Sequence, residues 1–133
     1  MNGSQLLAEI LKKENIKFLS CFPSTDLIES CAEINIKPII CRQERIGVAI
    51  ADGISRSTGG QQIGVFAMQG GPGAENSFPG AAQSFADNVP VLLIPGGESL
   101  NRSFISPNFV STNNYSNVTK WLAQVNDINR LPQ

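Results

Sequence analysis

The 133-residue sequence predicts a three-layer α/β/α domain built around a mostly parallel β-sheet. Two observations lead to this fold class. Short apolar runs alternate along the chain with amphipathic stretches of helical spacing, and the apolar runs are continuous, without the in/out alternation of a half-exposed strand. Continuous runs are typical of parallel strands that helices cover on both faces. The length fits one domain, and we expect residues 1–133 to form it.

The first half of the chain predicts three helices and two strands. In chain order these are helix 4–14, strand 18–22, helix 27–34, strand 38–41 and helix 44–58. We expect Ser4 to cap the first helix. Ser24, Thr25 and Asp26 are cap candidates for the second helix. The third helix is followed by Gly59-Gly60, as glycines commonly follow a helix C-terminus.

The second half predicts further strands at 63–67 and 91–94, joined by a helix that reaches about Asp87. Pro79 deletes a backbone donor from that helix, so the helix either kinks there or becomes regular only near Ser77. Residues 98–117 are rich in Ser and Asn, which predicts a functional loop or a stretch that a partner orders.

The C-terminal residues predict a last strand and the start of one more helix. The apolar residues of the strand are Val118, Trp121, Leu122 and Val125. Asp127 would cap the helix, with Ile128 and Leu131 inside it. Because this helix is begun and not finished at Gln133, we expect a fragment of a longer chain, with a naturally frayed terminus as the alternative.

Composition excludes several classes of function. The net charge is -1 and histidine is absent, so no basic surface for nucleic acid is expected. No apolar run approaches the roughly 20 residues that cross a bilayer, and no signal peptide is recognisable, which predicts a cytoplasmic protein without membrane contact. Cys21, Cys31 and Cys41 lie in or beside apolar stretches at a spacing that fits no metal site. We expect them to be small buried residues, and we expect no metal ligand on this chain.

Three polar or glycine-rich segments follow predicted strands: Pro23-Ser24, Arg42-Gln43-Glu44 and residues 69–73. Ligands of open parallel sheets bind beyond the carboxyl ends of the strands, so these segments should share one edge. Glu44 opens a helix rich in small residues. Its position has two explanations, a functional carboxylate or an acid that the helix dipole favours by about 0.3–1 kcal/mol.

The glycine-rich segment Gly70-Gly71-Pro72-Gly73 precedes a helix, where free amides attract anions. It lacks both the dinucleotide-binding pattern and the Lys-Ser/Thr of a P-loop. Taken alone, the segment is better explained as a tight turn from strand to helix. The amides of Gln69 and Asn76, taken singly, also fit simple capping of this turn.

Five motifs occur in a characteristic order over residues 15–97. They are Phe22-Pro23-Ser24, residues 42–49, residues 51–59, Gly71-Pro72-Gly73-Ala74-Glu75-Asn76 and Ala86-Asp87-Asn88-Val89-Pro90-Val91. In this order they resemble the N-terminal, pyrimidine-binding domain of thiamine-diphosphate-dependent enzymes, the family of acetolactate synthase, benzoylformate decarboxylase and related 2-oxo-acid decarboxylases. The resemblance implies a flavodoxin-like pyrimidine-binding (PYR) domain.

The family resemblance also implies the chemistry of the site. The glutamate that matches Glu44 hydrogen-bonds N1′ of the cofactor aminopyrimidine and is the catalytic residue that activates thiamine diphosphate for decarboxylation or carboligation of a 2-oxo acid. Pro23 and the Gly71-Pro72-Gly73 turn would shape the cofactor pocket. Asn76 would lie nearby.

Some family features are missing from this sequence. Ser24 and Gln43 stand where many members have Gly and His, and Asn108-Phe109-Val110-Ser111 lacks the glutamine of the Ala-Phe-Gln-Glu stretch of acetolactate synthases. The Gly-Asp-Gly motif, which holds Mg²⁺ and the diphosphate on a separate domain, is also absent.

The resemblance therefore implies that another domain supplies the diphosphate and Mg²⁺ site. That domain would belong to the same longer chain, in a homodimer or higher oligomer, or to a separate subunit, as in sulfopyruvate-type decarboxylases. A non-catalytic dimerisation domain of the same fold is a further alternative. An unrelated flavodoxin-like nucleotide binder is the last, and it is disfavoured because no dinucleotide or P-loop pattern is present.

Overall fold

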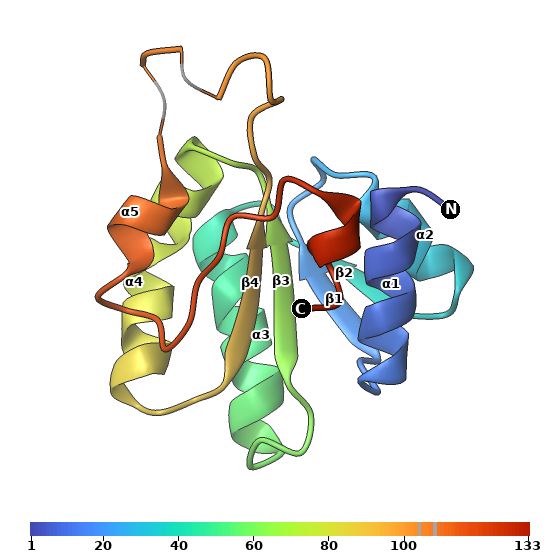
Figure 1. The fold of residues 1–133 in the computed structure, drawn as a ribbon. Helices are drawn as coiled ribbons and strands as arrows, with labels where there is room; N and C mark the ends of the chain where they lie inside the picture. The colour runs from blue at the N-terminus through green and yellow to red at the C-terminus, as the bar shows by residue number, and fades with distance from the viewer. Residues whose placement is uncertain (104, 108) are drawn as a thin grey trace.

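The computed structural model describes residues 1–103, 105–107 and 109–133 (Figure 1). The regular elements, in chain order, are α1 (Gly3–Lys13), β1 (Phe18–Cys21), α2 (Leu27–Glu33), β2 (Lys37–Ile40), α3 (Glu44–Ser57), β3 (Gly64–Met68), α4 (Pro72–Ala86), β4 (Val91–Pro95), α5 (Ser111–Tyr115) and the 3₁₀ helix η1 (Ile128–Arg130). Through β4 each predicted helix and strand is present, with ends within two residues of the prediction.

The four strands form one parallel sheet in the order β2-β1-β3-β4. β1 lies in the middle and pairs with both β2 and β3; Ser20, for example, is in register with Ile39 on one side and Phe66 on the other. β2 lies on one side of β1, and the chain then crosses over β1 to place β3 on its other side. The strand order thus reverses beside β1, which is where ligands bind in sheets of this type.

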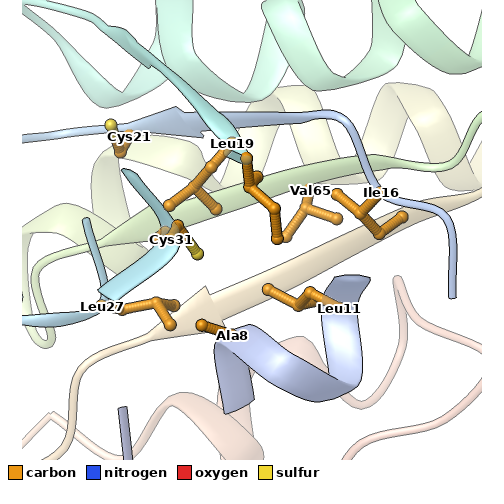
Figure 2. Packing of buried hydrophobic residues seen from close by; sticks show 10 residues of the cluster. Ala8, Leu11, Ile16, Leu19, Cys21, Leu27, Cys31 and Val65 are labelled. Atoms are coloured by element: carbon orange, nitrogen blue, oxygen red, sulfur yellow. The ribbon is translucent and has the colours of Figure 1, made fainter. Parts of the chain in front are cut away.

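Helices cover both faces of the sheet, so the predicted three layers are confirmed. α1 and α2 lie on one face, and α3 and α4 lie on the other (Figure 1). Figure 2 shows Leu11 of α1 and Leu27 of α2 directed toward Leu19 and Val65 of the strands. On the opposite face Phe66 packs against α3 and α4. Successive strand residues point to opposite faces, so continuous apolar runs fill both cores.

The three cysteines are free and buried, as the apolar sequence around them predicts. Burial raises the pKa of Cys21 and of Cys31 to about 11, with a smaller contribution from a neighbouring thiol in each case. Burial also raises the pKa of Cys41. All three side chains are protonated packing groups at neutral pH.

Two predicted helix caps are wrong. α1 is capped by Asn2, because Asn2 Oδ1 accepts from the Gln5 amide at 2.9 Å and Gln5 Oε1 accepts from the Asn2 amide at 3.0 Å. This capping box satisfies two backbone donors together, which Ser4 inside the helix cannot do. Asp26 stands at the N-cap of α2, but its side chain makes no capping hydrogen bond.

Of the two alternatives for α4, the late start near Ser77 is wrong. The helix begins at Pro72, where a missing N–H costs nothing because first-turn amides have no partner within the helix. Pro79 lies inside this helix. The hydroxyl of Ser77 donates to the Gly73 carbonyl at 2.6 Å, which adds a side-chain bond within the same first turns.

The predicted last strand is also wrong. Residues 118–126 form no helix or strand, and the side chains of Trp121 and Val125 are 68% and 46% exposed. A strand needs a paired neighbour or a covered face, and these side chains have no such cover. The prediction of a loop over 98–117 missed α5, whereas Asp127 does cap a helical turn by accepting from the Asn129 amide at 2.9 Å. None of the helices in the described ranges reaches the length and apolarity of a membrane span.

Candidate active site at the carboxyl edge of the sheet

Close packing of α3 on β3 places Glu44. Gly47 permits this approach, because a Cβ there would lie 2.1 Å from Cε2 of Phe66. The hydroxyl of Ser20 in β1 donates to the Gly47 carbonyl at 2.8 Å and ties the same turn of α3 to the central strand. Glu44, the first residue of α3, is thereby held at the carboxyl edge of the sheet and is only 8% exposed.

The two carboxylate oxygens of Glu44 have different surroundings. Oε2 accepts a hydrogen bond from Nδ2 of Asn76 in α4 at 2.8 Å. Oε1 has no hydrogen-bond partner among the described residues, yet it is not a fully buried atom, so it stays open to a ligand. A Cβ on Gly73 would lie 3.2 Å from Oε1, so the bare glycine leaves the space beside this oxygen free.

Glu44, Gly73 and Asn76, three of the predicted site residues, therefore meet in the structure. They come from two helices whose first turns lie next to each other. Simple capping does not account for the glutamate, because its side chain bonds to Asn76 across 32 positions of sequence and to no backbone amide of α3 in the described contacts.

Gly71 and Pro72 directly precede Gly73 in the chain. Gly71 has φ 56° and ψ -108°, a conformation that favours glycine, and it forms the sharp entry to α4. Both residues line a shallow depression together with Gly96, Glu98 and Phe109. The sequence did not single out Glu98, because an isolated acid after β4 carries no motif.

Pro23 lies at the same edge but not in the Glu44 cluster. The preceding amide, Phe22 N, donates to the Ala67 carbonyl at 3.0 Å, which holds the segment against the end of β3. Pro23 itself lines a separate depression with Thr25 and Ile40. Thr25 Oγ1 is the one buried side-chain polar atom of the described residues that has no hydrogen-bond partner.

Arg45 is a site residue that sequence reasoning missed. Its Nε donates to Oδ1 of Asn76 at 3.0 Å, so Asn76 lies between Arg45 and Glu44. Adjacent residues of a helix point in different directions, and sequence spacing gives no reason to expect both to reach one asparagine. Only the packing of α3 against α4 brings them to it.

The side chains around Glu44 fit an aminopyrimidine better than a metal ion. A carboxylate oxygen that is open beside a bare glycine suits a flat ring that presents a nitrogen to be hydrogen-bonded. Within the described parts of the chain, no group of three or more His, Cys, Asp or Glu side chains is placed to hold a metal ion.

Comparison with known proteins identifies the family of this domain. Residues 1–117 match the family model for the thiamine pyrophosphate enzyme, N-terminal TPP binding domain, where thiamine pyrophosphate is another name for thiamine diphosphate. The chain belongs to this family. The match extends beyond residues 15–97, on which the sequence resemblance was based, and confirms that resemblance and the fold that it implied.

Relatives of this TPP-binding domain include large subunits of acetolactate synthase. The chain is 29% identical over 100 residues to the acetolactate synthase large subunit of Haemophilus influenzae, and 30% identical over 100 residues to that of Buchnera aphidicola subsp. Acyrthosiphon pisum. Each alignment covers 72% of this chain but only 17% of the relative. The chain thus matches about a sixth of the length of these relatives.

The family match does not restore the Ala-Phe-Gln-Glu stretch of acetolactate synthases, which this sequence lacks. The nearest equivalent of that motif is 108–111, and Asn108 lies outside the described residues. Phe109 lines the depression beside Gly71, and Ser111 begins α5. The absence of a glutamine from this stretch is a property of the sequence that the family match does not change.

Proposed function

We propose that this TPP-binding domain is the pyrimidine-binding half of an enzyme that decarboxylates or ligates a 2-oxo acid, and that Glu44 activates the cofactor. One observation supports this most directly. Glu44 is buried with one oxygen held by Asn76, and its other oxygen is open beside Gly73. A positioned carboxyl group of this kind is suited to share a proton with a ring nitrogen.

Each site residue has a distinct part in this proposal. Oε1 of Glu44 would hydrogen-bond N1′ of the aminopyrimidine and would give or take the proton there. Asn76 holds the second oxygen, and Gly73 leaves room for the ring. Gly71 and Pro72 would form a wall next to Gly73, and Pro23 would border the site from the separate depression at the same edge. When bound, thiamine diphosphate supplies the carbon that adds to the 2-oxo acid and the electron sink for loss of carbon dioxide.

The other half of the active site would come from a second domain. The sequence has no Gly-Asp-Gly, and the chain covers about a sixth of its acetolactate synthase relatives. In the proposal, Mg²⁺ and the diphosphate are held by another domain of the same longer chain, across a homodimer or higher oligomer, or by a separate subunit. The complete enzyme would be a lyase or a transferase.

The test is Glu44→Gln in the complete enzyme with Mg²⁺ and saturating thiamine diphosphate. We expect turnover of a 2-oxo acid to fall by about 10²–10⁴-fold, because an amide cannot exchange the proton. Glu75→Gln is the matched control, since Glu75 is an exposed acid in the first turn of the neighbouring α4. Full activity of the Glu44→Gln enzyme would refute the proposed mechanism.

Two further outcomes would change the assignment. If activity appears only after mixing with a polypeptide that carries Gly-Asp-Gly, the chain is one subunit of a heteromeric decarboxylase. If the assembled protein binds no cofactor by calorimetry and tolerates every substitution of Glu44, the domain is a non-catalytic dimerisation module.

A further inference from the structure

We infer that Arg45 is a positioning residue, which acts through Asn76 to determine which oxygen of Glu44 carries the exchangeable proton. This inference rests on the proposed function of Glu44. It adds a residue that no motif of the sequence indicates, and it gives Asn76 a role in orienting the carboxyl group.

The inference starts from the hydrogen-bonding capacity of three side chains. Arginine has only donors, so the atom of Asn76 that faces Nε of Arg45 at 3.0 Å must be the amide oxygen. The amide nitrogen therefore faces Glu44, where it donates to Oε2 at 2.8 Å. An ionised Glu44 carboxylate, which only accepts, favours the same orientation, so Arg45 is the group that keeps it when Glu44 is protonated and could also donate.

This orientation decides where the proton of the Glu44 carboxyl group lies. In a protonated carboxyl group the carbonyl oxygen is the better acceptor, so the bond from Nδ2 of Asn76 favours Oε2 as the unprotonated oxygen. The proton is then carried by Oε1, the oxygen beside Gly73 that has no partner among the described residues. That oxygen is the one that the proposed function assigns to N1′.

Without Arg45 the asparagine amide is free to turn over. In the reversed orientation its oxygen faces Glu44 and accepts the carboxyl proton, which holds that proton away from the Gly73 side. The exchange between Glu44 and the cofactor then becomes slower, although both residues are still present. Exchange scales with the fraction of molecules in the competent orientation, so the roughly tenfold slowing expected here corresponds to a reversed orientation that is populated about nine times as often as the one in the structure.

A purely structural role predicts a different result. Arg45 is exposed, and interactions of exposed charged side chains add little to stability. If Arg45 only packs on the surface, its removal should leave the chemistry of the bound cofactor unchanged.

The experiment is a double-mutant cycle in the complete enzyme with Mg²⁺ and thiamine diphosphate. The readout is the rate of solvent deuterium exchange at C2–H of the bound cofactor, measured by NMR after rapid quenching. We expect about tenfold slower exchange in Arg45→Met, at least tenfold slower exchange in Asn76→Ala, and no further loss when Arg45→Met is added to Asn76→Ala. Arg45→Lys should restore most of the rate, because an ammonium group also donates to Oδ1.

Controls separate this inference from the proposed function. Arg130→Met, which removes an exposed arginine of η1, should exchange at the parent rate, and the cofactor dissociation constant of Arg45→Met should stay within about twofold of the parent value. The role of Arg45 would be overturned if Arg45→Met slowed exchange by the same factor in the parent enzyme and in Asn76→Ala. It would also be overturned if Arg45→Met did not slow exchange at all. If Glu44→Gln also exchanges at the parent rate, the proposed function itself fails.

Discussion

Residues 1–97 and residues 98–133 differ in how far their apolar side chains are buried. In the first region, strand residues such as Leu19 and Phe66 are fully buried between two helical layers. In the second region, Tyr115 is the only described residue that is buried, and Trp121, the largest side chain, is 68% exposed. Continuous apolar runs therefore identify strands here, of which the central pair β1 and β3 is buried, whereas scattered apolar residues do not identify a strand at all.

The two regions also differ in what they give to the site. Glu44, Gly73, Asn76 and Arg45 all belong to the first region, where sheet and helices hold them in place. The second region contributes only the wall of the depression beside Gly71, through Glu98, Pro107 and Phe109. The comparison predicts that the core of the first region sets stability and that the second region is attached to it through few contacts.

The largest expected effect is a difference between two aromatic truncations. Phe66→Ala should lower the free energy of unfolding by about 3–5 kcal/mol, because it opens a cavity under α3 and α4. Trp121→Ala should change it by less than about 0.5 kcal/mol, because most of that side chain already faces solvent. Urea unfolding of both variants measures the difference. Equal losses would show that residues 98–133 share the core of the first region.

A pH titration separates the two regions next. The thiols of Cys21 and Cys31 have a pKa of about 11 in the folded state against an ordinary value of 9.0, because burial disfavours the thiolate. Their contribution to stability is complete below pH 9 and is lost as the pH rises toward 11, since the unfolded chain releases those protons first. The loss should approach about 1.4 kcal/mol per pH unit for each thiol.

Unfolding free energies at pH 8, 9, 10 and 11 measure this slope. Cys31→Ala should reduce the slope between pH 9 and 11. Tyr115, whose pKa burial raises to about 12 from 10.0, should add a loss that begins only above pH 10. A flat profile from pH 9 to 10 would contradict the buried environment of the two thiols.

The smallest expected effect concerns the attachment of the second region. The hydroxyl of Tyr115 donates to the Ala74 carbonyl in α4 at 2.5 Å, and its ring meets Phe78 edge-on with centroids 5.3 Å apart. Tyr115→Phe should therefore cost about 0.5–1.5 kcal/mol, the net value of one hydrogen bond, while the ring contact remains. Urea unfolding measures the loss, and proteolysis within 98–114 should become faster in parallel. No change in either would show that other contacts fix α5.

The sequence predicted some features of the structure correctly and others wrongly. The elements of the first region were predicted by local signals, because each local preference agrees with the final fold. These signals are the apolar strand runs, the glycines after α3 and the Gly71-Pro72-Gly73 turn. The family motifs singled out Glu44 and Asn76 before any contact was known. The caps of α1 and α2 and the strand at 118–125 were wrong, because capping needs a specific partner atom and a strand needs a neighbour or a covered face.

The sequence by itself determined the layered parallel fold and the family, and it singled out Glu44 as the candidate carboxylate, since these follow from apolar periodicity and from the order of motifs. The tertiary structure decided which oxygen of Glu44 is held and which is open, and it revealed Arg45 behind Asn76. The physical reason is distance along the chain. Glu44 and Asn76 are 32 positions apart, and only the packing of α3 against α4 brings the amide and the carboxylate within hydrogen-bonding distance.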